Sequence, residues 1–320
     1  MAIVSSVSVC ARITLDLHSL NNEGTEGNQQ QTRMVHIIDQ NGRRAIVNAI
    51  SGDMFKHILV GHLVPLLEAG GQPLSEPARR LDPDRITADE NFLKKAKEHK
   101  GKNSELLSHI LRDCSLTDLA GALFVDAALP RKSCVEFGWV VGLPATADGE
   151  PITTTEQYFH VKYAAERGKA AGGGTTVGSQ PIFHRPASSG IYAMICNLDL
   201  YRIGLNDITR EPVVDKPGRE QRAKALIHAL AATLLKPAGA QRNTQNPHIV
   251  NCEGVVATSA TSLPAPTVSP LHDGYREEME KTAAVLNGIS SGTVHVTRFA
   301  SLSEGIQVLV DLASGVELPD

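Results

Sequence analysis

Strict alternation of apolar and other residues near the N-terminus constrains the fold of this chain most. Every second position is apolar: Val7, Val9, Ala11, Ile13, Leu15 and Leu17. Side chains at a spacing of two lie on the same face of a strand. Residues 7–17 therefore predict a β-strand with one buried face.

The segments that follow predict further strands and helices. The polar stretch 19–32 is expected to be a long loop. Asn41-Gly42 between RMVHIIDQ and RRAIVNAI favours a hairpin with a type I′ turn. Further strands are expected at 134–143, 191–203, 248–259 and 293–299, and helices at 51–69, 88–100, 104–112, 218–236, 275–288 and 301–314. The order indicates an α+β fold of ferredoxin-like or RRM-like type, with a helical insertion and a flexible, glycine-rich one.

Composition excludes several classes of protein. The 320 residues allow two domains, or one with large insertions, and 42% of them are hydrophobic. No apolar run approaches the ~18 residues of a membrane span, and the N-terminus does not resemble a signal peptide. The five cysteines are widely spaced and form no C-x-x-C pair. We therefore expect a cytoplasmic protein with reduced thiols and without a membrane span.

The charges are distributed unevenly along the chain. The formal net charge is −4, of which residues 273–320 contribute −5 and the rest +1. Residues 219–242 carry five Lys and Arg against Glu220 alone. A local basic stripe can bind phosphate even when the total charge is near zero. A solvated helix face is the simpler interpretation of the same charges.

Catalytic and metal-binding signatures are missing from the sequence. Neither H-E-x-x-H nor G-x-S-x-G occurs, and His57 and His62 are five residues apart, which does not suit metal ligation from one helix face. The glycine run at 172–178 lacks the lysine that a P-loop requires. We expect no catalytic residues, no metal site and no cofactor.

The start of the helix at 51–69 is a candidate anion site. Ser51, Gly52 and Asp53 can cap this helix, whose N-terminus would present backbone N–H groups and a partial positive charge. Lys56 and His57 lie one turn further on and can reach the same anion. An ordinary capped helix explains the same residues.

Longer stretches resemble a known family. ARITLDLHSLNNEGTEGNQQQTRMVHIID, followed by VNAISGDMFKHI, resembles the CRISPR-associated autoregulator (DevR) family. FHRPASSGIYAMICNLDL and the 218–236 helix with GAQRNTQNP after it reinforce the resemblance. Members of this family supply the repeated backbone subunit of type I Cascade surveillance complexes and belong to the RAMP superfamily.

The resemblance implies a right-hand shape. Its palm would be a modified RRM formed by residues 1–71, 134–151 and 189–320. Residues 72–133 would be helical fingers, and residues 152–188 a flexible, hairpin-like thumb. The loop after the first strand, the start of the first helix and a polar loop after the long helix would hold guide RNA. The corresponding residues here are Asn21, Asn22, Asn28, Arg33, Ser51, Gly52, Asp53, Lys56, His57, Gln241, Arg242 and Asn243.

The implied function is a non-catalytic CRISPR guide-RNA scaffold. The partners would be crRNA, target DNA, further copies of the chain in a filament, and the other Cascade subunits, namely the large subunit and the one that caps the crRNA 5′ handle. Asn and Gln side chains and helix N-termini contact phosphate and 2′-hydroxyl groups without reading bases, as a guide of any sequence requires. With only 4% aromatic residues, the chain does not suit ordinary RRM stacking. The acidic tail is expected to face away from RNA.

Three alternatives belong to other classes. A RAMP-type RNA nuclease would need an Asp in the loop after the first strand, where residues 19–32 hold Glu23 and Glu26 but no Asp. A DNA-binding transcriptional regulator would be expected to show a helix-turn-helix pattern, which is not visible. A metabolic enzyme would require a pocket with converging titratable groups.

Overall fold

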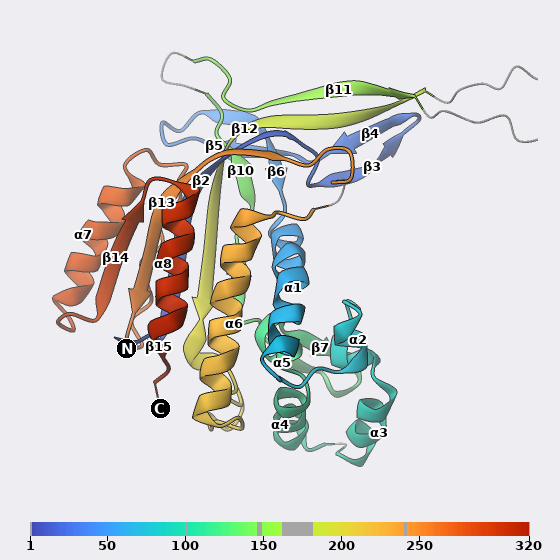
Figure 1. Ribbon diagram of the computed structural model, residues 1–320, viewed down its shortest axis with the longest axis vertical. Coiled ribbons are helices and arrows are strands. Elements are labelled where there is room, and N and C mark those ends of the chain that lie inside the picture. Colours follow the sequence, from blue (N-terminus) through green and yellow to red (C-terminus); the bar gives the residue numbers. More distant parts are fainter. Residues whose placement is uncertain (1, 100, 146–148, 162–181, 240–241, 320) are drawn as a thin grey trace, which may run out of the picture.

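A large sheet, the helices packed against it and a helical insertion make up the described part of the protein (Figure 1). The computed structural model describes residues 2–99, 101–145, 149–161, 182–239 and 242–319. Within these ranges, no helix combines the length and apolarity needed to cross a lipid bilayer. All five cysteines are free and buried.

The strands are β1 Ala2–Ile3, β2 Ser6–His18, β3 Asn22–Glu26, β4 Gln29–Thr32, β5 Met34–Ile38, β6 Arg44–Ile50, β7 Ala122–Phe124, β8 Leu129–Arg131, β9 Val135–Phe137, β10 Val140–Gly142, β11 Thr154–Val161, β12 Ile182–Asp199, β13 His248–Ser259, β14 Val294–Phe299 and β15 Val316–Glu317. The helices are α1 Gly52–Ala69, α2 Glu76–Arg79, α3 Glu90–Glu98, α4 Asn103–Asp113, α5 Ser115–Ala120, α6 Lys216–Leu235, α7 Tyr275–Asn287 and α8 Leu302–Gly315.

The large sheet runs in the order β14-β13-β2-β12-β10-β6-β5, and every pair along this path is antiparallel. The α+β class predicted from the sequence is therefore confirmed. β2 lies in the middle, paired with β12 on one side and β13 on the other. The C-terminal elements β14 and α7 lie at one edge of the sheet, and β5 forms the other edge (Figure 1).

The strand predicted from the alternation is confirmed, but its first half is buried on both faces, and Leu17, expected on the buried face, is 46% exposed. Val7 and Val9 belong to the main core with the helices α1 and α6, as the pattern predicts. Cys10, which points to the opposite face, packs in a second core with Tyr275 and Met279 of α7. The helix α7 thus covers a face that the alternation alone predicts to be open to solvent.

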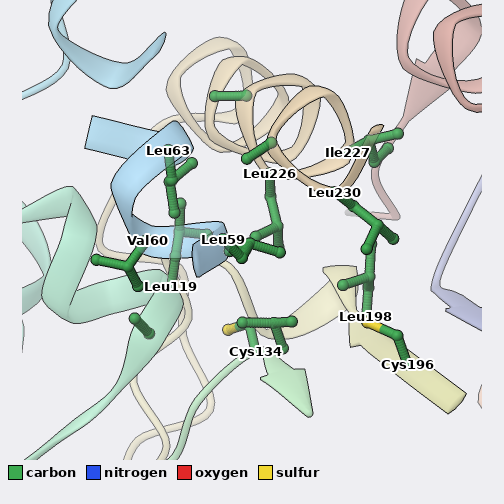
Figure 2. Close-up of a cluster of buried hydrophobic side chains, with 14 of the residues drawn as sticks. Leu59, Val60, Leu63, Leu119, Cys134, Cys196, Leu198, Leu226, Ile227 and Leu230 are labelled. Atoms are coloured by element: carbon green, nitrogen blue, oxygen red, sulfur yellow. The ribbon is translucent and has the colours of Figure 1, made fainter. Parts of the chain in front are cut away.

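The helices α1 and α6 cover one face of the sheet. Figure 2 shows Leu59 and Leu63 of α1 and Leu226 and Leu230 of α6 in one buried cluster with Leu198 of β12. Each of these side chains is fully buried. Burial of a leucine side chain contributes about 1.5–3 kcal/mol, so this cluster holds the two helices on the sheet.

The expected loop at 19–32 is wrong, because β3 and β4 form an antiparallel hairpin there. Gly27 supplies its turn with a φ of +63°. The two strands have no apolar face, so the alternation that identifies a strand is missing from their sequence. The hairpin is a polar ribbon that lies beside β12, where Gln29 pairs with His184.

The hairpin at 34–50 is confirmed as β5–β6, but its turn is not type I′. Gly42 donates its amide to the carbonyl of Asp39 (3.0 Å), and Asp39 donates its own amide to the carbonyl of Arg43 (2.9 Å). Gly42 alone within this turn has a positive φ, +77°. This is a longer loop, in which a glycine follows an ordinary turn.

Two other strand predictions need correction. The strand predicted at 134–143 is divided into β9 and β10 by Gly138 and Trp139. The strand predicted to begin at 191 begins at Ile182 instead, because residues 182–189 pair with β11 over its whole length. β11 and this half of β12 project together beyond the helices (Figure 1). The glycine run lies outside the described residues.

The insertion after α1 holds α2 to α5 and the small β7–β8 hairpin, and it is anchored by a buried carboxylate. Asp118, fully buried on α5, accepts hydrogen bonds from Arg131 Nη2 (2.6 Å), Arg222 Nη1 (2.7 Å) and the amide of Gly204 (2.9 Å). Burial lowers the pKa of Arg131, but Asp118 and Asp207 outweigh this effect and raise it, so the guanidinium stays charged. Asp118 thus ties the insertion to α6.

The basic segment at 219–242 is not a surface stripe. Arg222 is buried against Asp118, and Arg219 is buried with its Nε on the carbonyl of Ile203 at 2.8 Å. Both interpretations of this segment, a phosphate-binding stripe and a solvated face, are therefore wrong for these two arginines. Their role is to satisfy polar groups inside the fold.

We predict that Asp118→Asn lowers the free energy of unfolding by about 3–5 kcal/mol, because it leaves the buried Arg222 without its carboxylate and Arg131 with Asp207 alone. Urea unfolding followed by circular dichroism measures the change. The matched control is Asp113→Asn, which removes an exposed carboxylate 3.2 Å from Lys95 and should cost less than about 1 kcal/mol. Equal effects of the two substitutions would contradict the anchoring role of Asp118.

Candidate nucleic-acid interface

The first turn of α1 is fastened to the chain that leaves β2. Ser51 caps the helix by accepting the amide of Met54 on its Oγ (3.2 Å). The amide of Ser51 donates to Asn21 Oδ1 at 2.8 Å. Asn21 is buried, so its carboxamide oxygen is used inside the fold. The sequence predicted both Asn21 and Ser51 as site residues, and the structure brings them into contact. The role of Asn21 in this contact is to position the start of the helix.

The base of the β3–β4 hairpin is fixed by a second asparagine. Asn48 Nδ2 donates to the carbonyl of Arg33 (3.0 Å), and Asn48 Oδ1 accepts from the hydroxyl of Tyr192 (2.9 Å). The amide of Arg33 in turn donates to the carbonyl of Asn21 (3.2 Å). These bonds fix the backbone of Arg33 at the base of the hairpin. Asn48 was not among the residues that the sequence singled out, because nothing in its surroundings marks it as buried.

A cavity of about 330 Å³ opens beside this helix start. Gly52 allows the backbone of Phe137 to pack closely against the helix start, since a Cβ at this position would lie 2.5 Å from the carbonyl oxygen of Phe137. The residues that line it are Ser51, Gly52, Asp53, Lys56, Ser133, Val135, Glu136, Phe137 and Trp139. Four of the predicted binding residues therefore share one cavity.

Lys56 is the basic group in the wall of this cavity. Burial lowers the pKa of its ammonium group, and the charge of Arg85 lowers it further, whereas Asp53 and Glu136 act in the opposite direction. The wall of the cavity therefore contains one partly buried cation, Lys56, and two carboxylates, Asp53 and Glu136. It offers hydrogen-bond acceptors as well as positive charge.

The sequence reasoning missed five residues of this cavity: Ser133, Val135, Glu136, Phe137 and Trp139. Trp139 has the largest side chain among them. Its ring is 45% exposed, and the guanidinium carbon of Arg33 lies 5.1 Å from the ring centroid. Arg33 also forms an ion pair with Glu23 of β3. Gly138 could have been a signal, because Gly inside a strand often marks a bulge or a bend, and Trp139 follows it directly.

The loop after α6 approaches the other side of the hairpin base. Gln245 Nε2 donates to the carbonyl of Pro186 (3.1 Å), which places this loop against β12. Several nearby side chains hold buried polar atoms without a protein partner in the part of the chain that the structure describes: His18 Nε2, Asn22 Nδ2, His184 Nδ1, Arg242 Nη1 and Gln245 Oε1. Buried polar atoms without partners are rare in native proteins, so each calls for an explanation such as a bound polar molecule.

The remaining predicted residues are spread around these features. Asn22 Oδ1 accepts from Ser19 Oγ at 2.8 Å, and the carbonyl of Asn28 accepts the amide of His184 at 2.9 Å. His57 is exposed on α1 and does not line the cavity. Arg242 is half-buried and Asn243 is exposed, whereas Gln241 lies outside the described residues.

The fold is similar to that of a chain in a solved CRISPR assembly. A chain of a "CRISPR RNA-guided surveillance complex, pre-nicking" superposes with a TM-score of 0.53 at 13% identity, covering 96% of this chain and 99% of that one. A chain of a "CRISPR RNA-guided surveillance complex" gives 0.49 at 12% identity, with the same coverage. Csc2 of Thermofilum pendens gives 0.39 at 12% identity, covering 96% and 80%. No curated protein matches the chain.

In fold, the chain is thus of the same class as the first of these CRISPR assembly chains. The family model described as CRISPR-associated negative auto-regulator DevR/Csa2 matches residues 9–280. The chain belongs to this family, which confirms the resemblance drawn from the sequence.

We predict that Gly52→Ala lowers the free energy of unfolding by about 1–3 kcal/mol, because its Cβ would collide with the backbone of Phe137. The control lies on the same helix, where a Cβ at Gly61 would meet no atom within 4 Å. Gly61→Ala should stabilise the protein by up to about 1 kcal/mol through helix propensity alone. Thermal unfolding of both variants measures the difference, and a neutral Gly52→Ala would contradict the close approach.

We also predict a loss of stability in mild acid that depends on His18. Burial lowers the pKa of His18 from 6.5 to about 3. Below pH 6.5 the unfolded chain binds a proton at this histidine that the folded protein excludes, so stability falls as the pH drops toward 3. At about 1.4 kcal/mol per pH unit, the loss at pH ~5 is about 2 kcal/mol.

Urea unfolding of wild type and of His18→Gln at neutral pH and at pH ~5 isolates this contribution. The variant lacks the titrating group, so its stability should fall less between the two conditions. The same pH dependence in both proteins would show that His18 does not cause the loss.

Proposed function

We propose that this protein is a non-catalytic subunit that binds crRNA and forms the backbone of a type I Cascade surveillance complex. The observation that carries the proposal is the convergence of predicted RNA-binding residues at one place in a member of the DevR/Csa2 family. Ser51, Gly52, Asp53 and Lys56 line one cavity, and Arg33 lies against its Trp139 wall.

The groups at the start of α1 can bind an RNA backbone without recognising its base sequence. The first turn of α1 presents backbone amides, and Lys56 supplies a positive charge one turn later. Exposed asparagines at the tip of the β3–β4 hairpin and after α6 add groups that can contact phosphate and 2′-hydroxyl oxygens. Within the described residues, polar atoms of His18 and Arg242 have no protein partner and would find acceptors along the same RNA.

The connectivity of the sheet supports a modified RRM palm formed by residues 1–71, 134–151 and 189–320. The strand β2 leads to α1, then to β9 and β10, then to β12, α6 and β13, which is the β-α-β-β-α-β order of ferredoxin-like folds. In the sheet, β12 lies between β2 and the pair β9 and β10. Residues 72–133 would be the fingers, and 152–188 a thumb whose arms are β11 and the start of β12.

Further copies of the chain, other Cascade subunits and target DNA are the proposed partners. The edge hairpin β5–β6 exposes large apolar side chains, with Ile38 at 66% and Ile46 at 61%. An exposed apolar patch on an edge hairpin favours a protein partner. Copies in head-to-tail contact would form an open filament along the guide RNA.

The position of Glu23 argues against the nuclease alternative. Glu23 lies on β3 in an ion pair with Arg33. A carboxylate held by a guanidinium is poorly placed to activate water or bind a metal ion. The pairing instead supports a structural role for this carboxylate in orienting Arg33.

We predict that the double variant Lys56→Ala/Arg242→Ala binds single-stranded guide RNA more weakly without unfolding. Loss of two phosphate contacts should reduce the slope of log affinity against log salt by about 1.4, at about 0.7 per contact with a single strand. Fluorescence anisotropy of labelled RNA at several salt concentrations measures both quantities.

The matched control is Arg44→Ala/Lys281→Ala, which removes two exposed cations from β6 and α7, away from the cavity. This variant should keep the affinity and salt slope of the wild type. An unchanged slope in the Lys56/Arg242 variant would refute the assignment of these residues.

A further inference from the structure

Trp139 is the only tryptophan of the chain, and it is placed unusually for so large an apolar side chain. It follows Gly138 in the break between β9 and β10, and its ring is 45% exposed. Its neighbours Val135 and Val140 are buried in the sheet. The break thus turns one aromatic side chain out of the sheet and into the wall of the cavity beside α1.

A guanidinium group holds this ring. The Arg33 guanidinium lies 5.1 Å from the ring centroid, and its ion pair with Glu23 keeps it there. The Arg33 backbone is held as well, by hydrogen bonds to Asn21 and Asn48. An aromatic ring beside an arginine plane is the arrangement on which proteins stack unpaired RNA bases.

The rest of the cavity suits a nucleoside better than a phosphate. Asp53 and Glu136 line it as well as Lys56, and two carboxylates repel a phosphate while accepting hydrogen bonds from ribose hydroxyls. Its volume of about 330 Å³ is at the small end of the range for small-molecule sites, about 300–1,000 Å³. A cavity of this size can take one small group such as a nucleoside, with the neighbouring phosphate next to Lys56.

We propose that Trp139 and Arg33 form a stacking platform for one unpaired nucleoside of the bound RNA, with its ribose beside Asp53 and Glu136. This inference rests on the proposed RNA-binding function and adds a specific subsite to it. Stacking tolerates any base, because every base has a π-face, so the platform is compatible with a guide of variable sequence. Arg33 becomes a positioning residue that acts through the ring of Trp139.

Tryptophan fluorescence of the full-length protein monitors this subsite without an added label, because all tryptophan emission comes from Trp139. Titration with single-stranded RNA should quench this emission saturably, at the concentrations at which anisotropy of labelled RNA shows binding. Inorganic polyphosphate is the control, since it carries the charge of RNA without bases. Polyphosphate should leave the emission unchanged even where it competes for the site.

Substitutions of Trp139 then distinguish the stacking of its aromatic ring from the mere apolar bulk of its side chain. Trp139→Leu should weaken RNA binding about tenfold, whereas Trp139→Phe should retain most of the affinity because it keeps an aromatic face. Arg33→Ala should reduce the quenching of Trp139 by RNA. Arg44→Ala, on the neighbouring β6 strand, is the matched control and should behave as the wild type.

The outcomes distinguish this inference from the function on which it rests. RNA binding with unchanged Trp139 emission, or equal quenching by polyphosphate, would overturn the platform and leave the RNA-binding role standing. Absence of RNA binding by the wild type would overturn both. Saturable quenching by RNA alone supports the platform even if Trp139→Leu does not fold, because that measurement uses the wild-type chain.

Discussion

The antiparallel pairing of β2 with β12 is the constraint on which the rest of the structure depends. The register runs from Ser6 opposite Asp199 to His18 opposite Ser188, and β13 pairs along the other side of β2. This strand pair sets the platform on which α1 and α6 pack. It also decides where the chain leaves the sheet after His18, and hence where Asn21 and the β3–β4 hairpin meet the first turn of α1.

Two kinds of interaction position the candidate interface. Hydrogen bonds of Asn21 and Asn48 fasten the hairpin base to α1 and to Tyr192, so the polar residues near the cavity are held by buried amide groups. At the far end of α1, the carboxylate of Asp118 holds the helical insertion against α6. Buried polar groups with complete hydrogen bonding favour one arrangement, because any other leaves charges without partners.

The C-terminal elements β14 and α7 lie at the sheet edge opposite to β5, with β13, β2, β12 and β10 between β14 and the β5–β6 hairpin. Within them, Arg298 pairs with Glu277 and Glu280, so part of the acidic charge is neutralised locally. The local charge around α1 therefore matters more for an RNA ligand than the net charge of −4. At physiological salt, exposed charges more than roughly 8–10 Å from a ligand are largely screened, so charges close to the ligand dominate.

The sequence by itself determined the elements whose patterns are local. The alternation of residues 7–17 predicted β2, and the cap at Ser51 predicted the start of α1. Pro237 predicted the end of α6. Periodicity, capping and proline act over only a few residues, so these signals are present in the sequence itself. Through the family resemblance it also identified four of the nine residues that line the cavity. Only the tertiary structure decided that β3 and β4 pair, that Arg219 and Arg222 are buried, and that Trp139 lies against Arg33. These features depend on contacts between segments far apart in the chain, for which a single sequence carries no local signal.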